Sequence, residues 1–192
     1  MKKDGWIREE LESAGETLRR TAAACDAQIA RAAEAVVETL QRGGKVLLCG
    51  NGGSAADAQH MATEMTVKMG KVRSPMAAIA LTTNSSLLTA QANDLGFDTV
   101  FSRQIESLGR AGDVLIAIST SGMSANILRG VASARAMGIK VIGLAGCGGG
   151  ELAPLCDIPI VVPSSEVQRI QEAHIAVCHL ICEFAETTIF GE

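Results

Sequence analysis

Five apolar segments that alternate with helical segments constrain the fold of this chain more than any other feature. Each apolar run is nearly continuous, as in a parallel strand that is buried on both faces. Helical connections favour parallel pairing because parallel strands need long crossovers. We therefore predict an α/β fold, a doubly wound five-stranded parallel sheet of the flavodoxin-like kind, flanked by helices. The predicted strands are residues 45–50, 76–81, 113–119, 140–146 and 157–163.

Helical periodicity fills the segments between and after these strands. The predicted helices are residues 54–67, 84–93, 99–109, 125–137 and 166–188. Two further helices are predicted within residues 4–42, before Gly43 and Gly44. Such a long helical arm must bury its apolar face against its own sheet or a sister subunit. We expect one domain, 1–192, with an oligomerisation arm (1–43) and an α/β core that includes the C-terminal helix (44–192).

The composition argues against several classes of partner. The 192-residue chain has a net charge of -4 and a pI near 5.4, which does not favour non-specific binding to nucleic acid or to an anionic membrane surface. No apolar run approaches the roughly 18 residues of a membrane span, and no signal peptide is visible. The six cysteines form no CxxC pair. We expect a cytoplasmic protein without disulfides, nucleic-acid partners or a membrane.

The turn after the first strand resembles a dinucleotide-binding loop. Its residues 50–55, "GNGGSA", fit the loose G-x-G-x-x-A pattern. An acidic residue that would bind a ribose should end the second strand, but Thr82, Thr83 and Asn84 stand there. A phosphate loop of the GxxxxGK[ST] type is also missing from the sequence. We therefore expect no nucleotide cofactor.

A second turn, residues 119–124, follows the third strand and reads "STSGMS". Ser119, Thr120, Ser121 and Ser124 place four hydroxyl groups at the start of a helix. Backbone N–H groups and the positive end of the helix dipole there favour a phosphate group. The alternative is a turn whose serines only cap the helix. We call this segment the serine turn, and residues 51–53 the glycine turn.

Acid–base residues stand on two predicted helices. His60 and Glu64 are four residues apart, so they share a helix face. They could bind a divalent metal or move protons, and the alternative is a surface or structural contact between the two side chains. The last helix carries Gln171, His174 and His179. Gln171 and His179 are about 12 Å apart along a straight helix. They therefore have different roles, or one of them acts with another subunit.

Four stretches together resemble the sugar isomerase (SIS) domain family, and within it the phosphoheptose isomerases. They are "CGNGGSAADAQH", "NDLGF", "GDVLIAISTSGMSANIL" and "RIQEAHI". The resemblance implies an aldose–ketose isomerase that converts sedoheptulose 7-phosphate to D-glycero-D-manno-heptose 7-phosphate, the first step toward the heptose of bacterial lipopolysaccharide. It also implies a homotetramer with active sites between subunits, and one zinc ion per subunit.

The resemblance also implies roles for individual residues. Glu64 and His179 match the proton-transfer pair, and His60, Glu64, Gln171 and His179 match the metal positions. Substrate contacts are implied for Asn51, Gly52, Gly53, Glu64, Asn93, Asp94 and Gln171. The same resemblance implies that Ser119, Thr120, Ser121 and Ser124 hold the phosphate.

Two other functions fit the same family resemblance. One is a non-enzymatic SIS protein that binds a replication initiator, but the presence of both Glu64 and His179 favours an enzyme. The other is an SIS isomerase or sensor for another sugar phosphate, which would share the serine turn. The "NGGSAADAQH" and "RIQE" stretches favour the heptose substrate.

Overall fold

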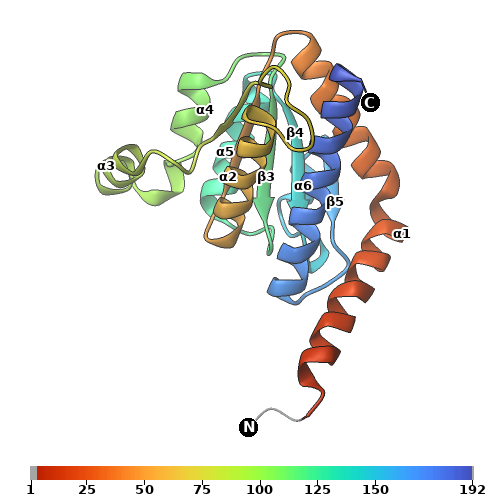
Figure 1. Ribbon diagram of the computed structural model, residues 1–192. Helices are drawn as coiled ribbons and strands as arrows, with labels where there is room; N and C mark the ends of the chain where they lie inside the picture. Colours follow the sequence, from red (N-terminus) through yellow and green to blue (C-terminus); the bar gives the residue numbers. More distant parts are fainter. Residues whose placement is uncertain (1–3, 192) are drawn as a thin grey trace.

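The computed structural model describes residues 4–191 as a parallel sheet between two layers of helices (Figure 1). All strand pairs are parallel, and the strand order is β2-β1-β3-β4-β5. The predicted doubly wound fold is therefore confirmed. The strands are β1 (Val46–Gly50), β2 (Ala78–Ala80), β3 (Val114–Ser119), β4 (Lys140–Ala145) and β5 (Ile158–Val161).

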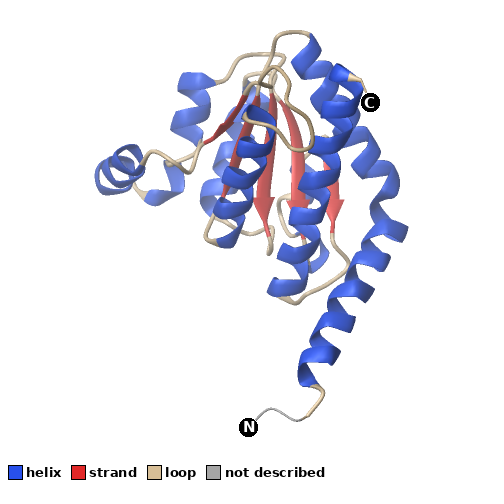
Figure 2. Cartoon of the chain, viewed as in Figure 1, coloured by secondary structure: helices blue, strands red, loops and turns tan. Residues whose placement is uncertain are grey.

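Helices cover both faces of this sheet (Figure 2). Short 3-10 turns occur at Phe97–Thr99, Cys147–Gly149 and Ala153–Leu155. The α-helices are α1 (Trp6–Gln41), α2 (Gly53–Thr66), α3 (Ser85–Leu95), α4 (Ser102–Leu108), α5 (Ala125–Ala136) and α6 (Val167–Phe190).

Alternation along the strands divides the apolar core into two layers. Leu48 and Ile116 pack with α1, α2 and α6 on one face of the sheet. Leu47 and Leu115 point to the other face, where α4 and α5 cover them. Each of these four side chains is fully buried, so the central strands lack a polar face. This burial on both sides explains why their sequences read as continuous apolar runs.

The prediction of two N-terminal helices is wrong, because residues 6–41 form the single 36-residue helix α1. Gly15 lies within it, but an interior glycine costs a helix only about 1 kcal/mol relative to alanine. Packing of the C-terminal half against β5 and α6 supplies more than that. The buried Arg169 of α6 also anchors the exposed N-terminal half of α1. The Arg169 guanidinium donates to the Glu10 carbonyl oxygen and pairs with the Glu10 carboxylate.

Three other expected elements are shorter than predicted. β2 spans three residues rather than six and β5 four rather than seven, because each is an edge strand with one neighbour. The helix expected over residues 99–109 begins at Ser102, after the separate 3-10 turn. Packing against α5 fixes this short helix in place.

Helix α6 corrects the expectation that no segment could span a membrane. Of the described helices, it alone is long and apolar enough to do so by length and composition. Val177, Ile181 and Ala185 of this helix instead lie in the core beside α1 and α2. Packing inside the domain therefore explains the apolar character of this face of α6, whereas Leu180 and Phe184 are exposed.

His174, in the middle of α6, is fully buried. Neither ring nitrogen has a hydrogen-bond partner among the residues that the structure describes. Burial lowers the pKa of His174 to about 4, although the nearby Ala145 backbone partly opposes this shift. The ring is therefore neutral in the folded protein at neutral pH.

This buried histidine predicts a specific loss of stability in acid. Because the unfolded chain binds the proton below about pH 6.5 and the folded chain only near pH 4, stability falls between these values, by up to about 3 kcal/mol. We expect His174→Leu to remove that part of the pH dependence. Urea unfolding between pH 7 and pH 4 measures it, and parallel curves for the two proteins would contradict the prediction.

Candidate active site

The two turns identified in the sequence lie next to each other at one edge of the sheet. β1 and β3 are paired neighbours in the sheet, with Gly50 opposite Ile118. From this pair the sheet extends to β2 on one side and to β4 on the other. The crossovers therefore diverge, and the crevice between them is the usual ligand site of such sheets. The glycine turn follows β1 and the serine turn begins at the end of β3.

A pair of side-chain amides connects the two turns. Asn51 Nδ2 donates to Asn126 Oδ1 at 2.8 Å, and Asn126 Nδ2 donates to Asn51 Oδ1 at 2.8 Å. Asn126 is buried, and its Oδ1 also accepts a hydrogen bond from the Ile127 backbone N–H. Sequence reasoning missed Asn126, although it follows the serine turn directly. The amide pair fixes the position of one turn relative to the other.

The hydroxyl groups of the serine turn are not used mainly to cap α5. Ser124 occupies the cap position, but its side chain makes no capping hydrogen bond. Its Oγ lies 3.2 Å from Ser119 Oγ, and Ser119 Oγ accepts from the Gly122 N–H at 3.1 Å. The Ser121 Oγ accepts from the Met123 N–H. The Ser119 and Ser124 hydroxyls therefore lie together at the N-terminus of a 12-residue helix, where an anion is favoured.

Glycines shape both turns. Gly52 has a φ of 55° and Gly122 a φ of 67°, and side chains rarely tolerate such positive values. An added Cβ at Gly122 would lie 2.2 Å from the Gly149 carbonyl oxygen. A Cβ at Gly53 would lie 2.2 Å from Gln171 Nε2, so the Gln171 amide lies directly over the glycine turn. The structure thus brings Gln171 to the predicted substrate loop.

The two histidines predicted at the site meet between α2 and α6. His60 Nε2 lies 3.0 Å from His179 Nε2, and the ring planes are 61° apart. Glu64 Oε1 is 3.4 Å from His60 Nε2, and the Glu64 side chain is 21% exposed. Two ring nitrogens that face each other at this distance share one proton or converge on one cation. A carboxylate and two imidazoles therefore occupy one partly open site.

Gln171 and His179 contact different points along α2. Gln171 lies over Gly53 at the start of α2, whereas His179 contacts His60 seven residues later. The two helices therefore run side by side in the same direction. The distance of about 12 Å between Gln171 and His179 along α6 corresponds to the distance between Gly53 and His60 along α2. No hydrogen bond joins Gln171 to either histidine among residues 4–191. Within that range, no three His, Cys, Asp or Glu side chains form a group that could hold a metal ion.

Asp57 is a site candidate that sequence reasoning missed. Its Oδ2 is buried and has no hydrogen-bond partner within the described part of the chain. Burial raises the pKa of Asp57, and the nearby His60 partly opposes this shift. Asp57 stands three residues before His60 on α2, and this spacing is the signal that could have revealed it.

Asn93 and Asp94 lie apart from the other predicted substrate residues. Both are exposed near the end of α3, and Asn93 Nδ2 donates to Asp94 Oδ1 at 2.7 Å. α3 projects beyond the β2 edge of the sheet (Figure 1) and contains no buried residue. Neither side chain has a hydrogen bond to the two turns in the described residues. Asn84, which follows β2, caps this helix by accepting from the Leu87 N–H.

Comparisons with known proteins agree with this arrangement. The SIS domain family matches residues 11–146. The chain belongs to this family, among the phosphoheptose isomerases. A phosphoheptose isomerase of Rhodospirillum rubrum is 54% identical over 165 residues, which cover 86% of this chain and 88% of that protein.

Two solved phosphoheptose isomerases have the same fold. The one from Francisella tularensis has a TM-score of 0.93 and 39% identity, with 97% of this chain and 100% of that chain covered. The one from Neisseria gonorrhoeae has a TM-score of 0.89 and 43% identity, with 94% and 97% covered. The chain is therefore an isomerase, as the sequence predicted.

A buried ion pair supports the helix that carries Glu64 in this isomerase. Arg73 donates to the Glu186 carboxylate at 2.9 Å and to the carbonyl oxygens of Glu64 and Met65. Glu186 also accepts from three consecutive backbone N–H groups, at residues 69–71. Burial alone would raise the pKa of Glu186, but these donors outweigh it and lower the pKa to about 2.

Replacing this carboxylate should destabilise the isomerase. Glu186→Gln leaves Arg73 buried without its counter-ion, at a cost of about 3–5 kcal/mol at pH 7. The folded pKa lies below the unfolded value, so the wild-type advantage is full above about pH 5 and is lost as the pH falls toward 2. Urea unfolding measures both effects. Glu183→Gln, at an exposed position on α6, is the control, and equal stability of the two variants would contradict the role of the ion pair.

Proposed function

We propose that this isomerase converts sedoheptulose 7-phosphate to D-glycero-D-manno-heptose 7-phosphate, a step toward bacterial surface heptose. The main support is that the glycine and serine turns meet at one sheet edge, and that α2, which begins at that edge, carries Glu64 and the His60 ring that faces His179. The relatives named phosphoheptose isomerase supply the sugar class.

In this proposal the serine turn binds the 7-phosphate. Hydroxyls of Ser119, Ser121 and Ser124, together with the N-terminus of α5, offer hydrogen bonds and a positive potential. Thr120 contributes a further hydroxyl. The glycine turn and Gln171 contact the sugar chain, since the amide already lies over Gly53. Asn93 and Asp94 also contact the substrate in this proposal. Since they lie on α3, away from the two turns of their own subunit, this contact requires α3 to move or the two residues to reach the site of a neighbouring subunit.

The isomerisation moves one carbon-bound proton and one oxygen-bound proton. The Glu64 carboxylate removes the proton from C1 of the ketose and returns it to C2, through an enediol. The His179 imidazole donates a proton to the C2 oxygen and receives the one that leaves the C1 hydroxyl. His60, 3.0 Å from His179, orients that ring and fixes which nitrogen carries the proton.

We also propose that the isomerase holds one zinc ion per subunit. The donor set fits in part, because two imidazole nitrogens face each other at 3.0 Å beside a carboxylate. His60, His179 and Glu64 would bind the ion after the Glu64 carboxylate turns toward both rings, because the three side chains do not form a metal-binding group as they stand in the described residues. Gln171 lies over Gly53, so a fourth ligand of this kind would come from a neighbouring subunit. Bound zinc would polarise the substrate carbonyl as a Lewis acid. It would also compete with the use of Glu64 as a base.

We also propose that the protein is a cytoplasmic homotetramer. Ile7 and Leu11 on α1 are each 69% exposed, and Leu180 and Phe184 of α6 are also exposed. Large exposed apolar side chains on neighbouring helices favour burial against other copies of the chain. The six cysteines form no CxxC pair, which favours a reducing compartment.

An assay with sedoheptulose 7-phosphate tests the proposed reaction. We expect the purified protein to form the aldose heptose phosphate and to leave arabinose 5-phosphate and glucosamine 6-phosphate unchanged. A parallel reaction with a chelator shows what zinc contributes, since a rate that zinc restores assigns it a catalytic role. Lack of turnover with the heptose phosphate, with or without added zinc, would contradict the proposal.

The two proton-transfer residues should be required for turnover. We expect Glu64→Gln and His179→Gln each to lower kcat by at least about a hundredfold, because general acid–base catalysis contributes about that much. Size-exclusion chromatography should show an unchanged oligomer. Gln59→Ala, at an exposed position beside His60 on α2, is the control. Wild-type kcat in both variants would refute the assignment.

A further inference from the structure

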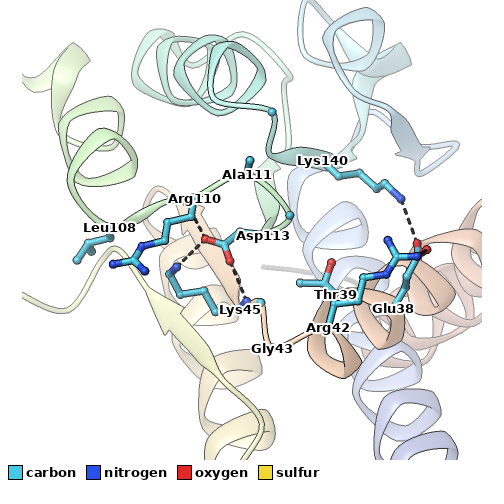
Figure 3. A pocket seen from close by; sticks show the side chains of 13 residues that line it. Glu38, Thr39, Arg42, Gly43, Lys45, Leu108, Arg110, Ala111, Asp113 and Lys140 are labelled. Carbon is cyan, nitrogen blue, oxygen red and sulfur yellow. Dashed lines mark hydrogen bonds and ion pairs between the residues drawn. The ribbon is translucent and has the colours of Figure 1, made fainter.

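A polar pocket lies at the sheet edge opposite the catalytic turns (Figure 3). It has a volume of about 600 Å³, and it is bounded by the start of β1, β3 and β4 and by the ends of α1 and α4. A cavity of this size accommodates a small ligand. Nothing in the proposed isomerisation uses it.

Cationic side chains line the pocket from two sides. Arg110 and Lys45 stand on one side in Figure 3, and Arg42 and Lys140 on the other. These four cations come from three separate parts of the chain. Their gathering around one cavity is a property of the folded protein.

The carboxylates of the pocket neutralise only part of this charge. Asp113 is buried and is fully engaged, since it pairs with Lys45 Nζ at 2.6 Å and accepts from the backbone N–H groups of Lys45 and Arg110. Glu38 is shared by Arg42 at 2.6 Å and Lys140 at 3.5 Å. Four cations against two carboxylates leave two positive charges.

Arg110 is the cation best placed to bind a ligand. Its side chain is exposed, and its guanidinium has no hydrogen bond or ion pair with any residue that the structure describes. An arginine fork with free donors suits the oxygens of a phosphate group. The carbonyl ends of α1 and α4 offset part of the positive charge, so the affinity is expected to be modest.

We propose that this pocket is a second anion site that binds the phosphate group of a small metabolite. A phosphate monoester carries a charge of about -1.5 to -2 at pH 7, which matches the two uncompensated cations. No aromatic side chain lines the pocket, so nothing there would stack on a nucleotide base. The ligand class is therefore free phosphate or a sugar phosphate.

Calorimetric titration of the full chain with inorganic phosphate, at fixed ionic strength, tests the site. We expect Arg110→Gln and Arg42→Gln each to weaken phosphate binding at the pocket by about tenfold or more, as for loss of a charge-assisted hydrogen bond. Arg103→Gln removes the same charge at an exposed position outside the pocket and should leave binding unchanged. None of these variants should alter the isomerase rate.

The catalytic phosphate site must be separated from the pocket. Combined Ser119→Ala, Ser121→Ala and Ser124→Ala should abolish binding at the serine turn and leave the pocket titration intact. Adding Arg110→Gln to that protein should weaken the remaining binding by the same factor of about ten or more. Because Arg110→Gln is also tested alone, a failure of the serine-turn assignment stays distinguishable from a failure of the pocket.

Two ligands distinguish the source of the phosphate group. Binding of glucose 6-phosphate tighter than that of inorganic phosphate, in the serine-turn variant, supports a sugar-phosphate site. The reverse order supports a site for free phosphate. The proposal would be overturned if Arg110→Gln and Arg42→Gln bound phosphate as tightly as Arg103→Gln does. It would also be overturned if the serine-turn variant bound neither ligand.

Discussion

The parallel pairing of β1 with β3 is the constraint on which the site depends. Both strands are buried on both faces, so their register is fixed by the packing of two helical layers. The sheet grows in opposite directions from this pair, and the connections that follow must separate. The glycine and serine turns therefore meet at one edge, where the Asn51–Asn126 amide pair holds them together.

The same two strands give the opposite edge a different character. Helices begin at the edge that carries the glycine and serine turns, where their N–H groups and positive dipole ends favour an anion without any lysine or arginine in the turn. Helices end at the other edge, where carbonyl oxygens concentrate and cationic side chains have gathered around Asp113 and Glu38. One fold thus offers two polar edges, built from backbone groups on one side and from side chains on the other.

Much of the fold could be predicted because local periodicity reports burial. The five strands and most helices follow from apolar runs and helical spacing alone. The errors fall where packing overrides local signals. Gly15 does not interrupt α1, because the helix packs along α6 and β5. β2 is short because an edge strand has one neighbour, and one face of α6 is apolar because it lies in the core.

The sequence by itself determined the fold class, the hydroxyl-rich turn and the His60–Glu64 spacing, because each depends on neighbours along the chain. Only the tertiary structure decided that His60 meets His179, 119 residues away, and that Gln171 lies over Gly53. It also decided the burial of the Asp57 Oδ2 atom and the partner of Asn51. Helical periodicity shows which face a side chain occupies, but the alignment of α2 with α6 is set by how both helices pack on the sheet.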